Sequence, residues 1–189
     1  MVVDSESVLG IAKTSIDMKV LSNEDWMPNL SEERYSDFRE NQGSFTTIYN
    51  QDHSLRGCIG LPYPNQPLGN AIAISARNAA TRDPRFVKLD KSELGDIIIE
   101  VEALSPIEQI QFQDENDLIS QIEVGMHGLL VKYGLQGGLL LPKVGERYDW
   151  DSLDLIQHTC QKAGLPKNAY TYSGIEFFKF TSVLYKANN

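Results

Sequence analysis

Residues 55–60 read Leu-Arg-Gly-Cys-Ile-Gly, and the interpretation of the whole chain starts from this stretch. Side chains of an extended segment alternate between two faces, so Arg56, Cys58 and Gly60 are expected on one face. A guanidinium on that face favours the thiolate form of a cysteine, and a glycine leaves open space beside it. The stretch is therefore the first candidate for a chemical site.

The residues before this stretch predict a β-hairpin. Apolar and hydroxyl side chains alternate with a period of two from Ser44 to Tyr49, as is typical of a strand. The polar residues 50–53 are suited to a turn, and Pro62 and the prolines after it end the second arm. We expect a hairpin over residues 44–61, with Cys58 well along its second arm.

Hydrophobic periodicity predicts the helices. Ser5 is the expected N-cap of the first helix, and Gly164 the expected end of the last. A proline after Asp83 stops the alanine-rich helix, because the residue before proline avoids the helical region. The predicted helices cover residues 5–21, 68–80, 114–124 and 150–163.

Further strands are predicted at 96–104, at 128–141 as a second hairpin, and at 175–185 as one last strand. Hairpins outnumber plausible crossover connections. The fold class is therefore α+β, a mainly antiparallel sheet with helices packed on one side. The 189 residues suffice for a single domain over the whole chain, with room for two lobes and a cleft whose boundary the pattern does not mark.

Composition excludes several classes of protein. A net charge of −9 argues against general affinity for nucleic acids, and two cysteines cannot form a disulfide framework. The sequence has no cysteine cluster of the kind that binds zinc, and no glycine-rich phosphate loop follows a strand. We therefore predict neither a metal nor a cofactor. The N-terminus does not resemble a signal peptide, and no run approaches the ~20 apolar residues of a membrane span. We expect a cytoplasmic protein with free thiols.

Several blocks of sequence together resemble one family. The chain is similar to the AMMECR-one family, whose signature is the motif at 55–60, and the resemblance covers nearly its whole length. It implies a two-lobed α+β protein of no established biochemical function, with a Memo-type or a radical SAM protein as partner. Glu102 and Gln136-Gly137 depart from the family pattern. The other matching blocks are Asp-Pro-Arg-Phe at 83–86, Ile-Glu-Val at 99–101, His-Gly-Leu at 127–129, Gly-Leu-Leu-Leu-Pro at 138–142 and Lys-Ala-Gly-Leu at 162–165.

Three residues are candidates for catalysis. Cys58 is a candidate nucleophile or redox thiol, although a free cysteine is more often packed as a small hydrophobic residue. Glu100 interrupts an apolar strand, and it is either a base with a raised pKa or half of a structural ion pair. His127 lies between glycines before a strand, where it could carry a proton or simply belong to a turn. Cys160 lies on the apolar stripe of its helix and is expected in the core.

The candidates for ligand binding surround Cys58. An arginine cluster at the end of the alanine-rich helix, at positions 77, 82 and 85 with Asp83 between, suits an anionic ligand, or else it complements the helix dipole. Arg56 could contact the same anion, or it could pair with Glu100 or Glu102. The predicted ligand-binding residues are Arg56, Gly57, Gly60, Asp83 and Arg85.

Two functions of different classes are compatible with these residues. The first is an enzyme, or an enzyme component, acting on a small anionic molecule at a cleft that contains Cys58. The second is a non-catalytic protein that binds a ligand or regulates a protein partner, because no complete catalytic signature is present. Nucleic-acid binding is disfavoured by the net charge, and no membrane association is expected.

Overall fold

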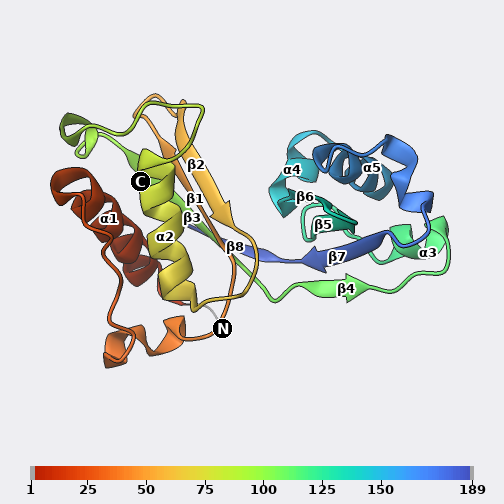
Figure 1. The fold of residues 1–189 in the computed structure, drawn as a ribbon, viewed down its shortest axis with the longest axis horizontal. Helices are drawn as coiled ribbons and strands as arrows, with labels where there is room; N and C mark the ends of the chain where they lie inside the picture. The colour runs from red at the N-terminus through yellow and green to blue at the C-terminus, as the bar shows by residue number, and fades with distance from the viewer. Residues whose placement is uncertain (1–2, 188–189) are drawn as a thin grey trace. The chain divides into compact units, whose positions relative to one another are not determined.

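The computed structural model describes residues 3–187, and the chain folds into two compact units. The first unit comprises Met1–Leu104 and Val183–Asn189, and the second comprises Ser105–Ser182. Each unit contains one four-stranded sheet together with its own helices (Figure 1). The predicted α+β class is therefore confirmed, and the antiparallel pairings that the structure defines support it.

The sheet of the first unit is built around β1 (Ser44–Tyr49). The predicted hairpin joins β1 to β2 (Leu55–Leu61), and β3 (Ile98–Leu104) lies antiparallel on the other side of β1. The strand β8 (Ser182–Lys186) completes the order β2-β1-β3-β8. The strand that carries Cys58 is thus at an edge of the sheet.

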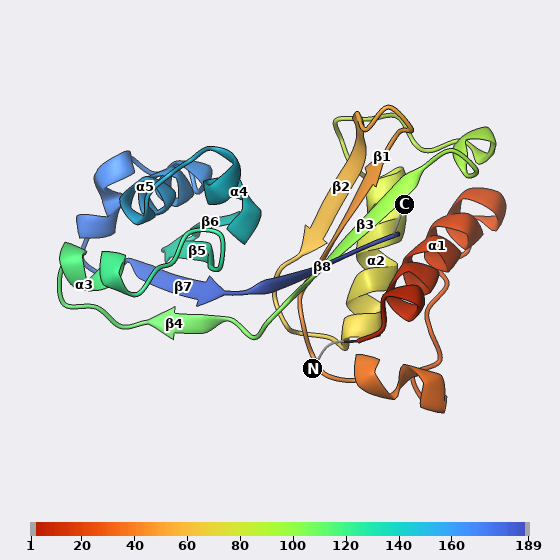
Figure 2. The same cartoon turned by 180° about the vertical axis from the view of Figure 1, so that it is seen from behind.

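Two helices, α1 (Ser5–Ser22) and α2 (Leu68–Thr81), cover one face of this sheet (Figure 1 and Figure 2). Gly57 permits the close approach of α2, because a Cβ atom there would overlap the carbonyl oxygen of Ala79. The N-cap of α1 is Asp4 and not the predicted Ser5: the Asp4 carboxylate accepts the Ser7 amide at 2.9 Å. Short 3₁₀ helices, η1 (Glu33–Phe38) and η2 (Lys91–Glu93), lie in the connections.

The sheet of the second unit has the order β4-β7-β5-β6. The hairpin of β5 (Gly128–Tyr133) and β6 (Gln136–Leu140) turns at Gly134, where a φ of +57° suits glycine. The strands β7 (Glu176–Phe180) and β4 (Glu108–Ile110) complete it. Its helices are α3 (Glu115–Ser120), α4 (Pro142–Arg147), α5 (Ser152–Lys162) and the 3₁₀ helix η3 (Lys167–Thr171).

Each unit has its own hydrophobic core. In the first, apolar residues of α1 and α2 pack against the sheet; in the second, α5 packs against β5 and β6. Cys160 is fully buried in the second core, as its place on the apolar stripe predicts. Within residues 3–187 no helix is long and apolar enough to cross a membrane.

The predicted single strand over residues 175–185 is wrong. It is two strands, β7 and β8, which belong to different sheets, with Thr181 between them. Phe177 is buried in the second core and Tyr185 in the first, so an unbroken apolar pattern serves two separate cores. The helix α4 is also unpredicted: Pro142 does not merely end the strand before it but begins a helix, a position that its fixed φ suits.

Candidate functional site

Cys58 lies on the face of the first sheet opposite to α1 and α2. Its strand neighbour Gly57 points at α2, and alternation sends Cys58 to the other face. Thr47 on β1 is directly opposite Cys58, and Glu100 on β3 is directly opposite Thr47. The hydroxyl Oγ1 of Thr47 donates to Sγ of Cys58 at 3.3 Å. A thiol, a hydroxyl and a carboxylate thus form one row across three strands.

The backbone of Cys58 is held by Asp83 and Arg85, which we call the Asp83–Arg85 bracket. Oδ2 of Asp83 accepts the Cys58 amide at 2.8 Å, and Nη2 of Arg85 donates to the Cys58 carbonyl at 3.3 Å. Because β2 is an edge strand, these two groups point away from the sheet and need other partners. The bracket supplies them and fixes the position of Cys58.

The Asp83 carboxylate is 2% exposed and fully engaged. Besides the Cys58 amide it accepts Nε of Arg85 at 2.9 Å, Nη2 at 2.7 Å and the Arg85 amide at 3.1 Å. Hydrogen bonds from the Arg85 side chain lower the pKa of Asp83 far below its usual range, against the opposing effect of burial. Asp83 is therefore a charged group of the scaffold, and the Arg85 side chain is the outward half of the bracket.

Arg56 has a different partner from the expected one. Its Nε and Nη2 donate to the two carboxylate oxygens of Glu93 at 2.7 and 3.0 Å, and Nη1 donates to the Val87 carbonyl at 2.9 Å. The predicted pairing with Glu100 or Glu102 is thus replaced by one with Glu93, whose pKa the guanidinium lowers. Because the Arg56 side chain is only 11% exposed and already paired, it anchors the segment 87–93 to β2.

The two glycines of the motif have packing roles. Gly57 makes room for α2, as described above. Gly60 does not leave open space beside Cys58, as its lack of a side chain suggested: the ring of Phe45, opposite on β1, covers it, and a Cβ atom would overlap that ring. The motif therefore needs glycine at both positions for close contact on opposite faces of one strand.

His127 belongs to the second unit, whereas the other predicted site residues belong to the first. Its Nδ1 accepts the backbone amide of Glu123 at 3.0 Å, closing the turn before β5. Burial, with a smaller effect of the Lys179 charge, lowers the pKa of His127. This places a neutral imidazole in a turn of the second unit.

Two residues beside the site have no signal in the sequence, Thr47 and Glu93. Continued without a shift from the pair of Tyr49 and Leu55, the register of β1 and β2 would place Thr47 opposite Gly57. The strand register shifts between Ile48 and Tyr49, and this irregularity brings Thr47 opposite Cys58 instead. Glu93 is 37 residues from Arg56 along the chain, and only the fold brings the two together.

Comparison with known proteins adds the family and the fold. The AMMECR1 family model matches residues 9–185. The chain belongs to the AMMECR1 family, the same family that its sequence blocks resemble. A family relative from Methanosarcina mazei is 38% identical over 97% of this chain and 91% of its own, and one from Aquifex aeolicus is 40% identical over 85% and 80%. Both carry only the name "Protein".

A solved structure has the same fold. The crystal structure of an uncharacterized protein from Pyrococcus horikoshii is similar to this chain with a TM-score of 0.85 and 32% identity. The match covers 95% of this chain and 89% of that one. The structural match supports the architecture, and the names of these relatives state no activity.

Proposed function

We propose that the protein is an enzyme, or a component of one, that acts on a small anionic molecule through the thiol of Cys58. The observation that carries the proposal is the Asp83–Arg85 bracket, which holds both backbone groups of a half-buried cysteine on an edge strand. A reacting group contributes most when its geometry is fixed before the substrate arrives. The reducing cytoplasm is the compartment in which such a thiol stays free.

In this proposal Arg85, and not Arg56, contacts the anion. Arg56 is almost buried and paired with Glu93, whereas the Arg85 side chain is 55% exposed. Its Nε and Nη2 contact Asp83, and Nη1 makes no hydrogen bond with any residue between 3 and 187. That nitrogen can donate to a carboxylate or a phosphate. Glu100, in the same cross-strand row as Cys58, is the proposed base.

A non-catalytic role is the second candidate, a protein that binds a ligand or regulates a partner. The observation that favours it is the pairing of Arg56 with Glu93, because a neutralised guanidinium promotes the thiolate less than a free one would. The Memo-type or radical SAM protein implied by the resemblance would then be the partner. The reactivity of Cys58 separates the two candidates.

The test compares a negatively charged alkylating reagent, iodoacetate, with the neutral iodoacetamide on the native protein. We expect Cys58 to react far faster than Cys160, whose pKa burial raises to about 11. We also expect the ratio of iodoacetate to iodoacetamide rates at Cys58 to exceed that of a free small thiol. Mass spectrometry of the labelled peptides measures both quantities.

The variant Arg85→Gln should lower that ratio toward the value of the free thiol, and Arg82→Gln is its matched control. Both arginines are exposed and close in sequence, but only Arg85 contacts Cys58. A Cys58 that reacts no faster than Cys160 contradicts the enzyme proposal and favours the non-catalytic one. If the ratio of iodoacetate to iodoacetamide rates is equal in the two variants, Arg85 is not part of the anion site.

A further inference from the structure

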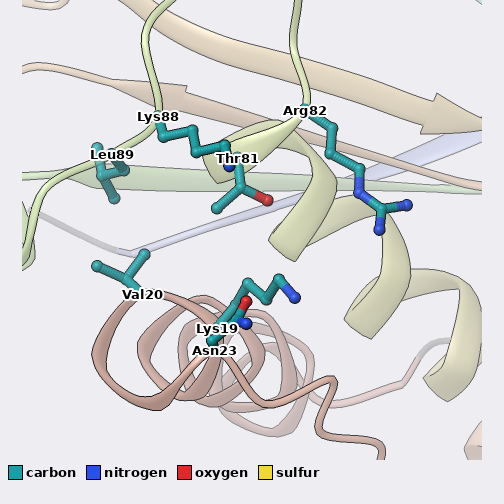
Figure 3. A pocket seen from close by; sticks show the side chains of 7 residues that line it. All are labelled: Lys19, Val20, Asn23, Thr81, Arg82, Lys88 and Leu89. Carbon is teal, nitrogen blue, oxygen red and sulfur yellow. The ribbon is translucent and has the colours of Figure 1, made fainter.

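A second site lies on the helical side of the first unit. A cavity of about 430 Å³ opens between the C-terminal ends of α1 and α2 and the segment that follows α2 (Figure 3). This volume is within the range of small-molecule sites, ~300–1,000 Å³. The lining residues are Lys19, Val20, Asn23, Thr81, Arg82, Lys88 and Leu89.

The charge of this cavity is opposite to that of the protein. The chain has 26 acidic and 17 basic residues, yet three of the seven lining residues are basic and none is acidic. Lys19 forms an ion pair with Asp25, with 2.9 Å between Nζ and Oδ1. Within residues 3–187, the side chains of Arg82 and Lys88 form no ion pair. Asp25 offsets part of this positive charge, because it pairs with Lys19 and also attracts Arg82. The remaining like charges repel one another, and a bound anion lowers that cost.

The ends of the two helices do not oppose an anion as strongly as bare C-termini would, because many of their carbonyls are already bonded. In α1, the carbonyls of Met18 and Lys19 accept the amides of Glu24 and Asn23. In α2, the carbonyl of Asn78 accepts the Arg82 amide, and that of Ala80 accepts the Leu89 amide. Capped carbonyls carry less free negative charge toward the cavity.

Further polar and apolar groups define the ligand. The side-chain amide of Asn23 adds hydrogen-bond donors beside the cations, whereas the Thr81 hydroxyl already donates to the Arg77 carbonyl at 2.7 Å. Val20 and the buried Leu89 form an apolar wall. From these contacts we infer a binding site for a small molecule that carries a phosphate group on an apolar body, held by Lys19, Arg82 and Lys88. The arginine cluster at the end of α2 thus serves two places, with Arg85 directed to Cys58 and Arg82 to this cavity.

The probes are phenyl phosphate and inorganic phosphate, titrated into the ¹⁵N-labelled protein. We expect saturable amide shifts at residues 19–23 and 81–89, and tighter binding of phenyl phosphate because its ring covers Val20 and Leu89. The variant Arg82→Gln/Lys88→Gln should weaken phenyl phosphate at least ~10-fold, since a charged hydrogen bond contributes ~1.5–3 kcal/mol and each 1.4 kcal/mol is tenfold. Both side chains are exposed, so the fold should persist.

The control variant, Arg34→Gln/Lys91→Gln, removes the same charge from exposed positions outside the cavity and should bind as the wild type does. Cys58→Ser should also bind normally, which separates this site from the proposed reaction at Cys58. Shifts centred elsewhere, equal weakening in the two double variants, or no saturable binding would each overturn the inference. Equal affinity for the two probes would rule out the apolar body.

Discussion

The substitution Asp83→Asn tests the bracket that holds Cys58. Asparagine keeps the shape of aspartate, but it replaces one acceptor oxygen by an NH₂ group. If the amide oxygen stays opposite Nε of Arg85, the NH₂ group faces the Cys58 amide, which loses its 2.8 Å hydrogen bond. Leaving an enclosed amide without a partner costs ~1–3 kcal/mol.

The loss of the ion pair adds less, because Arg85 is 55% exposed and water replaces its partner. The expected decrease in the free energy of unfolding is therefore ~2–3 kcal/mol at neutral pH. Urea denaturation followed by a probe in the first unit measures it. Asp17→Asn is the control: it removes the carboxylate of a half-exposed i,i+4 pair with Lys13 and should cost ~0.5 kcal/mol or less.

The effect should depend on pH with a definite sign. The folded pKa of Asp83 lies far below the ordinary aspartate value of 3.8, so its contribution is fully present above that value and decreases as the pH falls through the folded pKa. The stability difference between wild type and Asp83→Asn should be constant from pH 5 to 7 and should shrink below pH 4. Equal stability of the two proteins at pH 7, or a difference that grows in acid, would refute this account of the bracket.

Three further predictions concern stability. Cys160→Ser should lose ~1–3 kcal/mol because a hydroxyl replaces a fully buried thiol, and Cys58→Ser should lose much less; chemical denaturation giving the reverse order would place Cys58 in a core. Gly57→Ala should lower the melting temperature by overlap with Ala79, whereas Gly95→Ala, with no atom within 4 Å of the new Cβ, should not. Asp4→Ala should lower the free energy of unfolding by ~1 kcal/mol in chemical denaturation, because it removes the N-cap of α1; an unchanged free energy would contradict that cap.

Local pattern determined much of the first unit. The hairpin over residues 44–61 and the helix that begins at Leu68 are present as predicted, because alternation and helical spacing report which face of a segment is buried. The same holds for Gly164, which follows the C-terminal end of α5 with a φ of +76°. The family and the α+β class also follow from sequence alone.

The hydrophobic pattern of the sequence does not show which core a buried face joins. Residues 175–185 read as one amphipathic strand, yet the tertiary structure divides them at Thr181 between two sheets. A single β-period carries no information on which core each residue joins. The shifted register that pairs Thr47 with Cys58 is likewise decided by packing around the turn, since a one-residue shift in pairing leaves the sequence of each strand unchanged.

The partners of charged residues were decided only by the tertiary structure. The sequence identified Arg56, Asp83, Arg85 and Cys58 as candidates, but not that Asp83 binds the Cys58 amide or that Glu93 holds Arg56. These contacts span 25 and 37 residues and depend on the path of the segment after α2. Charge and spacing show that a side chain needs a partner, and the fold selects the partner, because ion pairing depends on distance in space and not along the chain.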